Sequence, residues 1–102
     1  MKNIDLIKYL EEISLRNHLK ILKLQGYMIK DLKKEDLELL IYKGFSSSTT
    51  HPIEFDPDKN VINEKLFFTN GQLYLSPLTK DSNNLIKESN QVLSFLDENY
   101  WN

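Results

Sequence analysis

Apolar residues over the first 24 positions recur at helical spacing, but their stripe changes phase partway. One helical face carries Leu6, Ile7, Leu10 and Ile13, and a face rotated well away from it carries Leu15, Leu19 and Leu22. Residues 4–24 are therefore either one helix that is covered on two sides or two short helices with a break near Ser14 to Asn17. Two helices are favoured, because Ser14 and Asn17 can both act as N-caps.

A further helical pattern follows Gly26, a residue type that often stands just after a helix end. Residues 31–43 place Leu37, Leu40 and Ile41 on one side of a helix, with Leu32 one turn earlier. Lys43-Gly44 gives this helix a basic last turn and a stop signal. The polar residues at 46–50 then predict a loop.

The most specific local signal is Asn70-Gly71, which favours a type I′ turn because both central residues need a positive φ. It predicts a β-hairpin from about Val61 to Ser76. A two-residue loop fixes the register, pairing Thr69 with Gln72, Phe68 with Leu73, Phe67 with Tyr74 and Leu66 with Leu75. Alternation assigns Phe68, Leu73 and Leu75 to the core and leaves Phe67 and Tyr74 as an aromatic pair on the other face.

Weaker signals flank the hairpin. Pro52–Phe55 reads as a short edge strand and Asp56–Asn60 as a turn. Thr79 or Asp81 caps a final amphipathic helix whose apolar stripe is Leu85, Ile86, Val92, Leu93, Leu96 and Tyr100.

These elements predict an α+β fold. It has two or three N-terminal helices, a small antiparallel sheet built on a hairpin turning at Asn70-Gly71, and a C-terminal amphipathic helix. The 102 residues suit one domain, because neither half alone has enough apolar residues for its own core. We expect a helical half at 1–45, a polar connector at 46–51, and the hairpin with the last helix at 52–102.

Composition limits the cellular location and the kinds of site that we expect for this domain. Cysteine is absent, which excludes disulfides and thiolate metal sites. The sequence has neither a signal-peptide pattern at its start nor an apolar run long enough to span a membrane, so we expect a cytoplasmic protein without membrane contact. Net charge is −2, but nine basic against seven acidic residues give +2 at 1–43, and four against eight give −4 at 44–102.

The sequence contains fragments of metal-binding motifs, but none of them is complete. Asp56-x-Asp58-x-Asn60 begins like a calcium loop, but Val61 and Phe67 stand where that loop needs glycine and a bidentate glutamate. The two histidines, His18 and His51, do not make a metal site by their spacing. Glycine clusters and nucleophile motifs are missing as well. We therefore expect no enzymatic activity, no catalytic residues, no metal and no cofactor.

A basic patch is the first candidate binding feature. Arg16, Lys20 and Lys23 line one edge of the predicted helix and could contact an acidic partner or nucleic acid. The order helix, helix, helix, hairpin, helix also allows a winged-helix DNA-binding regulator. Its recognition helix, 34–43, would present Glu35, Asp36 and Glu38 to phosphate, which disfavours this alternative.

The favoured function is a small protein-binding inhibitor or adaptor, such as a toxin-immunity protein or a phage-encoded inhibitor of a host factor. Acidic and aromatic residues of the second half would meet a basic surface on another protein. The candidate contact residues are Glu54, Asp56, Asp58, Phe67, Tyr74, Phe95 and Trp101. A homodimer formed through residues 81–100 is a further hypothesis.

Overall fold

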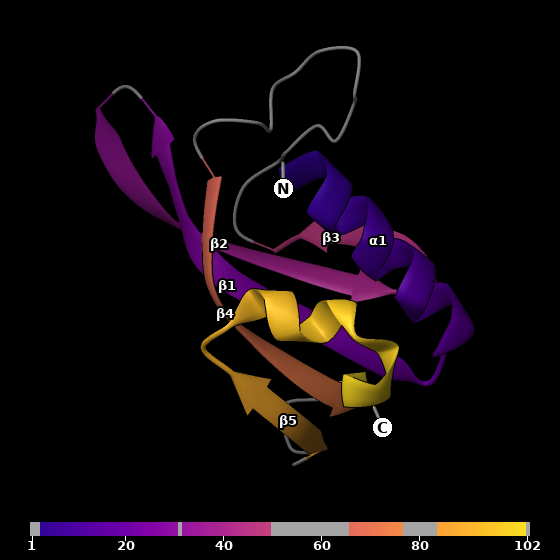
Figure 1. The fold of residues 1–102 in the computed structure, drawn as a ribbon. Helices are drawn as coiled ribbons and strands as arrows, with labels where there is room; N and C mark the ends of the chain where they lie inside the picture. The colour runs from indigo at the N-terminus through magenta and orange to yellow at the C-terminus, as the bar shows by residue number, and fades with distance from the viewer. Residues whose placement is uncertain (1–2, 31, 50–65, 77–83, 102) are drawn as a thin grey trace.

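In the part of the chain that the structure describes, one α-helix packs on one side of a five-stranded antiparallel sheet, and two 3-10 helices follow the last strand (Figure 1). The structure, a computed structural model, describes residues 3–30, 32–49, 66–76 and 84–101. The sheet order is β3-β2-β1-β4-β5. The elements are α1 (Asn3–Arg16), β1 (Lys20–Lys30), β2 (Lys33–Tyr42), β3 (Phe45–Ser48), β4 (Leu66–Leu75), β5 (Leu85–Ser89), η1 (Val92–Leu96) and η2 (Glu98–Trp101). The α+β class is confirmed, whereas the predicted second and third helices and the C-terminal α-helix are wrong.

Helix α1 follows the first apolar stripe of the sequence. Its inward residues are all buried: Leu6, Ile7, Leu10 and Ile13. The helix ends at Arg16, inside the predicted break, and the Asn17 side chain donates a hydrogen bond to the Ile13 carbonyl at 2.9 Å. The chain beyond the break is strand β1 rather than a second helix, and the fully buried Leu22 and Leu24 alternate with the half-buried Lys23.

Strand β2 replaces the helix predicted at 31–43. Its buried residues are Leu37, Leu39 and Ile41, which is the period-two spacing of a strand. The segment Leu37–Tyr42 is apolar at most positions, so helical spacing could select Leu37, Leu40 and Ile41 just as well. Pairing with β1, which extends from Leu22 opposite Ile41 to Lys30 opposite Lys33, decides between the two.

Asn70-Gly71 forms no turn, and the predicted hairpin is wrong in the described part of the chain. Strand β4 runs straight through both residues and pairs with β1 instead of with itself. Gly71 faces the core, where a Cβ atom would lie 2.6 Å from the Phe95 ring. Glycine is needed here to make room for that ring and not to supply a positive φ.

A two-residue turn with positive φ does occur, at Lys43-Gly44 between β2 and β3. Lys43 has a φ of 51° and Gly44 a φ of 85°, as a type I′ turn requires at both positions. Lys43-Gly44, which the sequence predicted to end a helix, is therefore the turn of the β2–β3 hairpin. Phe45–Ser48 pairs with β2 as an edge strand, although a loop was predicted from residue 46.

Gly26 lies within β1 and ends no helix. The register of β1 against β4 shifts next to it, since Gln25 faces Asn70 while Gly26 faces Phe68. Thr69 is thus the extra residue of β4, with no residue of β1 opposite it. This is a β-bulge. A Cβ atom on Gly26 would lie 1.9 Å from the Phe67 carbonyl oxygen, so the bulge brings the two backbones too close for any side chain.

The last segment is a short strand followed by 3-10 turns. Leu85–Ser89 pairs with β4 as strand β5, and η1 and η2 return over the sheet. The single stripe expected for an α-helix is split, because Val92, Phe95 and Trp101 are buried while Leu85, Ile86 and Leu93 are exposed. The predicted elements at Pro52–Phe55 and Asp56–Asn60, and the caps Thr79 and Asp81, lie outside the described residues.

One hydrophobic cluster joins α1, the sheet and the 3-10 helices. Strand β4, from the predicted second half, pairs directly with β1, from the predicted first half, so the boundary placed at 46–51 does not separate two structural halves. The members that are completely inaccessible to solvent are Leu10, Leu22, Leu24, Leu39, Ile41, Leu73, Phe95 and Trp101.

The packing of Phe95 on Gly71 gives a testable prediction. Gly71→Ala should lower the free energy of unfolding by roughly 1–3 kcal/mol, because the ring must shift within a filled core. Asn70→Thr should cost less than about 1 kcal/mol, since a β-branched residue suits a strand and only the bond to Gln25 is lost. Urea titrations of the two variants measure both values. A larger loss for Asn70→Thr would instead support a turn at this position.

Candidate binding surfaces

The sheet has one face without a described helix, and we call it the helix-free face. Helix α1, η1 and η2 all pack on the opposite side, against Leu22, Leu24, Leu39 and Leu73 (Figure 1). Side chains alternate along each strand, so the residues between these core positions point away from α1. The helix-free face therefore presents the second set of side chains on every strand.

Aromatic side chains from several strands lie on the helix-free face. Tyr27 of β1 and Phe67 of β4 face each other and stack, with ring centroids 5.0 Å apart and an angle of 22° between the planes. At the turn between β2 and β3, Tyr42 faces Phe45, which is 77% exposed. Tyr74 of β4 lies opposite Ile21.

Lysine side chains lie over three of these rings. The Nζ atom of Lys34 is 4.3 Å from the centroid of Tyr27, and that of Lys23 is 5.3 Å from Tyr74. At the β2–β3 turn, Lys43 Nζ lies 5.1 Å from the Tyr42 ring. Such cation–π contacts stabilise by about 0.5–1 kcal/mol at exposed sites. They hold the charged groups against the face instead of leaving them free in solvent.

A band of polar side chains crosses the middle of the helix-free face. Asn70 donates to Gln25 Oε1 at 2.9 Å, Gln72 donates to Glu88 Oε2 at 2.6 Å, and the Tyr74 hydroxyl donates to Gln72 Oε1 at 2.8 Å. These bonds link β1, β4 and β5 from side chain to side chain. The aromatic groups at the two ends of the face are thereby separated by a fixed polar region.

Glu38 extends this polar band onto β2. It forms an ion pair with Lys23 at 3.2 Å and accepts a hydrogen bond from the Thr49 hydroxyl at 2.6 Å. The Thr49 bond is the main cause that holds the pKa of the Glu38 carboxyl below its usual value, and Lys23 adds to it against the opposing effect of partial burial.

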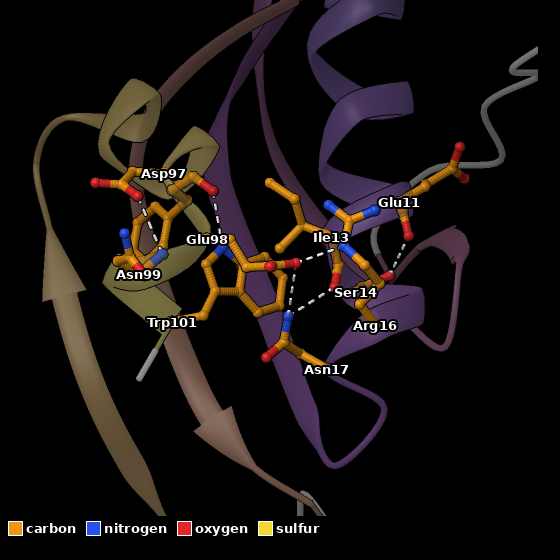
Figure 2. Close-up of polar contacts among 10 residues, drawn as sticks. Glu11, Ile13, Ser14, Arg16, Asn17, Asp97, Glu98, Asn99 and Trp101 are labelled. Atoms are coloured by element: carbon orange, nitrogen blue, oxygen red, sulfur yellow. Dashed lines mark hydrogen bonds and ion pairs between the residues drawn. The ribbon is translucent and has the colours of Figure 1, made fainter.

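The basic residues predicted to share a helix edge are separated. Arg16 ends α1 and forms an ion pair with Glu98 at 2.6 Å, while Asn17 also points toward that carboxylate (Figure 2). Lys20 and Lys23 lie in β1, where their spacing places them on opposite faces of the sheet. Lys20 Nζ donates to the Trp101 carbonyl. The single basic patch is therefore wrong, because its members belong to two kinds of element.

Two of the aromatic contact candidates belong to the core. Phe95 and Trp101 are completely buried, and the Trp101 indole N–H donates to the Phe95 carbonyl at 2.7 Å. Phe95 also packs edge-on against Tyr100. Phe95 was predicted to be a contact residue because it lies off the apolar stripe of an α-helix. The chain forms 3-10 turns here instead, and these turn Phe95 into the core.

The remaining candidates divide as follows. Phe67 is 44% exposed and Tyr74 is half-buried, but they lie on one strand and do not face each other. Glu54, Asp56 and Asp58 lie outside the described residues. Tyr27, Tyr42 and Phe45 were missed, although strand alternation applied to residues 20–30 and 33–42 would have found the first two.

A cleft of about 320 Å³ lies on the other side of the sheet, between α1 and the C-terminal 3-10 helices. It is lined by Tyr9, Glu12, Ile13, Arg16, Leu96 and Glu98. The Arg16–Glu98 ion pair forms part of its wall and fastens η2 to the end of α1. Within the described ranges, no group of three His, Asp or Glu side chains could hold a metal ion. No described helix is long and apolar enough to cross a membrane.

The family model for a domain of unknown function, DUF7734, matches residues 7–97. The chain belongs to the DUF7734 family. No curated protein and no solved structure matches the chain. The part that matches the DUF7734 model contains the five described strands, and with them the whole described helix-free face.

Glu38 gives this DUF7734 domain a testable pH dependence. Its folded-state pKa lies below its unfolded-state pKa, so the ionised carboxylate stabilises the fold above the unfolded value. That contribution is lost as pH falls through the folded-state pKa. Thr49→Val should raise the Glu38 pKa measured by NMR titration, and Lys23→Met should raise it as well. An unchanged Glu38 pKa in the Thr49 variant would contradict the role given to the hydroxyl.

Proposed function

We propose that this DUF7734 domain is a non-enzymatic protein-binding module, an inhibitor or adaptor, whose partner docks on the helix-free face. The observation that carries the proposal is that two aromatic pairs, Tyr27 with Phe67 and Tyr42 with Phe45, lie at the two ends of the side of the sheet away from α1. Aromatic residues are enriched in protein interfaces, where they supply large contact areas at low entropic cost.

The exposure of these rings supports contact with a partner. Phe45 is 77% exposed, and it sits at the start of an edge strand beside the β2–β3 turn. Burying a phenylalanine from this state stabilises by about 1.5–3 kcal/mol. Phe45 adds little of this to the fold of the isolated domain, but a partner that covered the ring would gain it.

The charges on the helix-free face favour a protein over a nucleic acid. Lys23 and Lys34 lie beside rings that could stack with the bases of a single strand. Asp36, Glu38 and Glu88 lie on the same face and would repel phosphate. The winged-helix geometry has lost its basis, because the segment taken for its recognition helix is β2. Mixed charges around aromatic groups suit a protein partner.

The test is capture from a lysate of the source organism with the tagged domain, repeated after nuclease treatment. Phe45→Ser and Phe67→Ser, made together, should abolish stoichiometric capture of a protein that the unaltered domain retains after nuclease. Leu93→Ser is the matched control, since Leu93 is a 63% exposed apolar residue on η1, away from the helix-free face.

Circular dichroism must show that each variant is folded. Loss of capture in the Leu93 variant alone would place the interface on the other side of the sheet. Capture that disappears with nuclease and weakens steeply in salt would replace the proposal by nucleic-acid binding.

A further inference from the structure

Leu32, next to the start of β2, contributes nothing by burial to the fold of this chain. Its side chain is 100% exposed, the highest value among the large hydrophobic residues of the described part. Its φ of 65° lies in the left-handed region, which a leucine rarely adopts because its Cβ atom crowds the neighbouring carbonyl. The residue is thus unfavourable for the isolated domain both in its exposure and in its backbone.

The β1–β2 hairpin holds Leu32 away from the body of the domain. Pairing between β1 and β2 continues to Lys30 opposite Lys33, whereas the described part of β4 pairs with β1 only as far as Met28 opposite Leu66. The hairpin accordingly reaches past its neighbours at the upper left of Figure 1. Among the described residues, those beside the β1–β2 turn, Leu32 included, therefore extend beyond the paired part of β4 at this end of the sheet.

The charges that follow Leu32 indicate what it would meet. Lys33 and Lys34 are exposed and come directly after it, and Lys34 lies over the Tyr27 ring at the near end of the helix-free face. In the sequence Asp31 and Leu32 stand between the two strands and Lys30, Lys33 and Lys34 flank them, so the tip sets one apolar side chain among three lysines and one aspartate. A complementary site is an apolar pocket whose rim carries carboxylates.

We propose that the β1–β2 tip is an anchor that inserts Leu32 into such an apolar, carboxylate-rimmed pocket of the partner protein. This inference rests on the proposed function and adds the chemistry of the partner's site. The tip and the Tyr27–Phe67 stack lie toward the same end of the sheet, so a partner can cover both in one contact.

A protein pocket fits the tip better than an anionic membrane does. Three lysines and one leucine, with Asp31 among them, give only marginal attachment to a bilayer, where stable binding takes stronger signals. Glu35 and Asp36 come immediately after the lysines and would be repelled by an extended layer of anionic headgroups, whereas a pocket that takes up only the tip leaves them outside its rim. Alternating charges of this kind are useful for discrimination between protein surfaces.

The experiment uses the full chain and the protein captured through the helix-free face, purified as the probe. Leu32→Asn should weaken binding of that protein by about tenfold or more, because the buried leucine side chain is lost. The same variant should melt at an equal or higher temperature, since asparagine adopts a positive φ more readily than leucine. Leu32→Met, which keeps an apolar side chain, should retain most of the affinity.

A merely structural role for Leu32 predicts the reverse, because weaker binding would then accompany a lower melting temperature. Lys33→Glu should weaken binding as well, by repulsion from the carboxylate rim. A photo-crosslinker in place of Leu32 should attach to apolar residues of the partner that have Asp or Glu beside them.

The outcomes separate this inference from the proposed function. Unchanged affinity of Leu32→Asn, with loss of binding in the Phe45/Phe67 variant, overturns the anchor and leaves the helix-free face as the interface. Failure to capture any protein overturns both. Sedimentation of the unaltered chain, but not of Leu32→Asn, with vesicles of phosphatidylcholine and phosphatidylserine would overturn the protein pocket in favour of a lipid surface.

Discussion

The pairing of β1 with both of its neighbours is the interaction on which the rest of this structure depends. β1 lies in the centre of the sheet, with β2 along one edge and β4 along the other. It carries Leu22 and Leu24 into the core, and without it the segments before and after residue 50 would share no sheet. Because β1 follows α1 after a short turn, the helix returns over one face only. The other face is left to side chains that the described core does not use.

Two glycines allow the core side to be packed this closely. Gly26 lets the bulged backbone of β4 approach β1, and Gly71 leaves room for the Phe95 ring. With Phe95 in place, Trp101 can bond to its carbonyl, and Lys20 of β1 bonds to the Trp101 carbonyl in turn. Arg16 fastens η2 to the end of α1 through Glu98 (Figure 2). The aromatic residues are thus divided by position: Phe95 and Trp101 stabilise the fold, while Tyr27 and Phe67 remain on the opposite face.

The sequence predicted α1 because only helical spacing fits its apolar residues, and it predicted the α+β class because strand signals were present. It predicted helices in place of β1 and β2 and a hairpin turn within β4. The errors at β2 and β4 have separate physical reasons. The leucine-rich segment Leu37–Tyr42 satisfies both periods, so tertiary pairing had to decide. Asn70-Gly71 has strong local turn propensity, but the contact of Gly71 with Phe95 is long-range and invisible in a local pattern. Of the candidate contact residues, Phe67 lies opposite Tyr27 instead of Tyr74, and the place of Phe95 depends on the 3-10 turns.

The same division separates the residues that stabilise this DUF7734 domain from those that we propose to contact a partner. Residues beneath α1 are in contact on all sides, so changes there act on folding first. Phe45 and Leu32 are mostly or completely exposed, and Leu32 also occupies an unfavourable backbone conformation. Neither the exposure nor the backbone conformation stabilises the isolated chain. A partner surface that covered these side chains would gain the free energy of burying them. Other apolar side chains are exposed as well, among them Leu15 and Leu93 on the α1 side of the sheet, but of the described residues only Leu32 combines full exposure with a strained backbone.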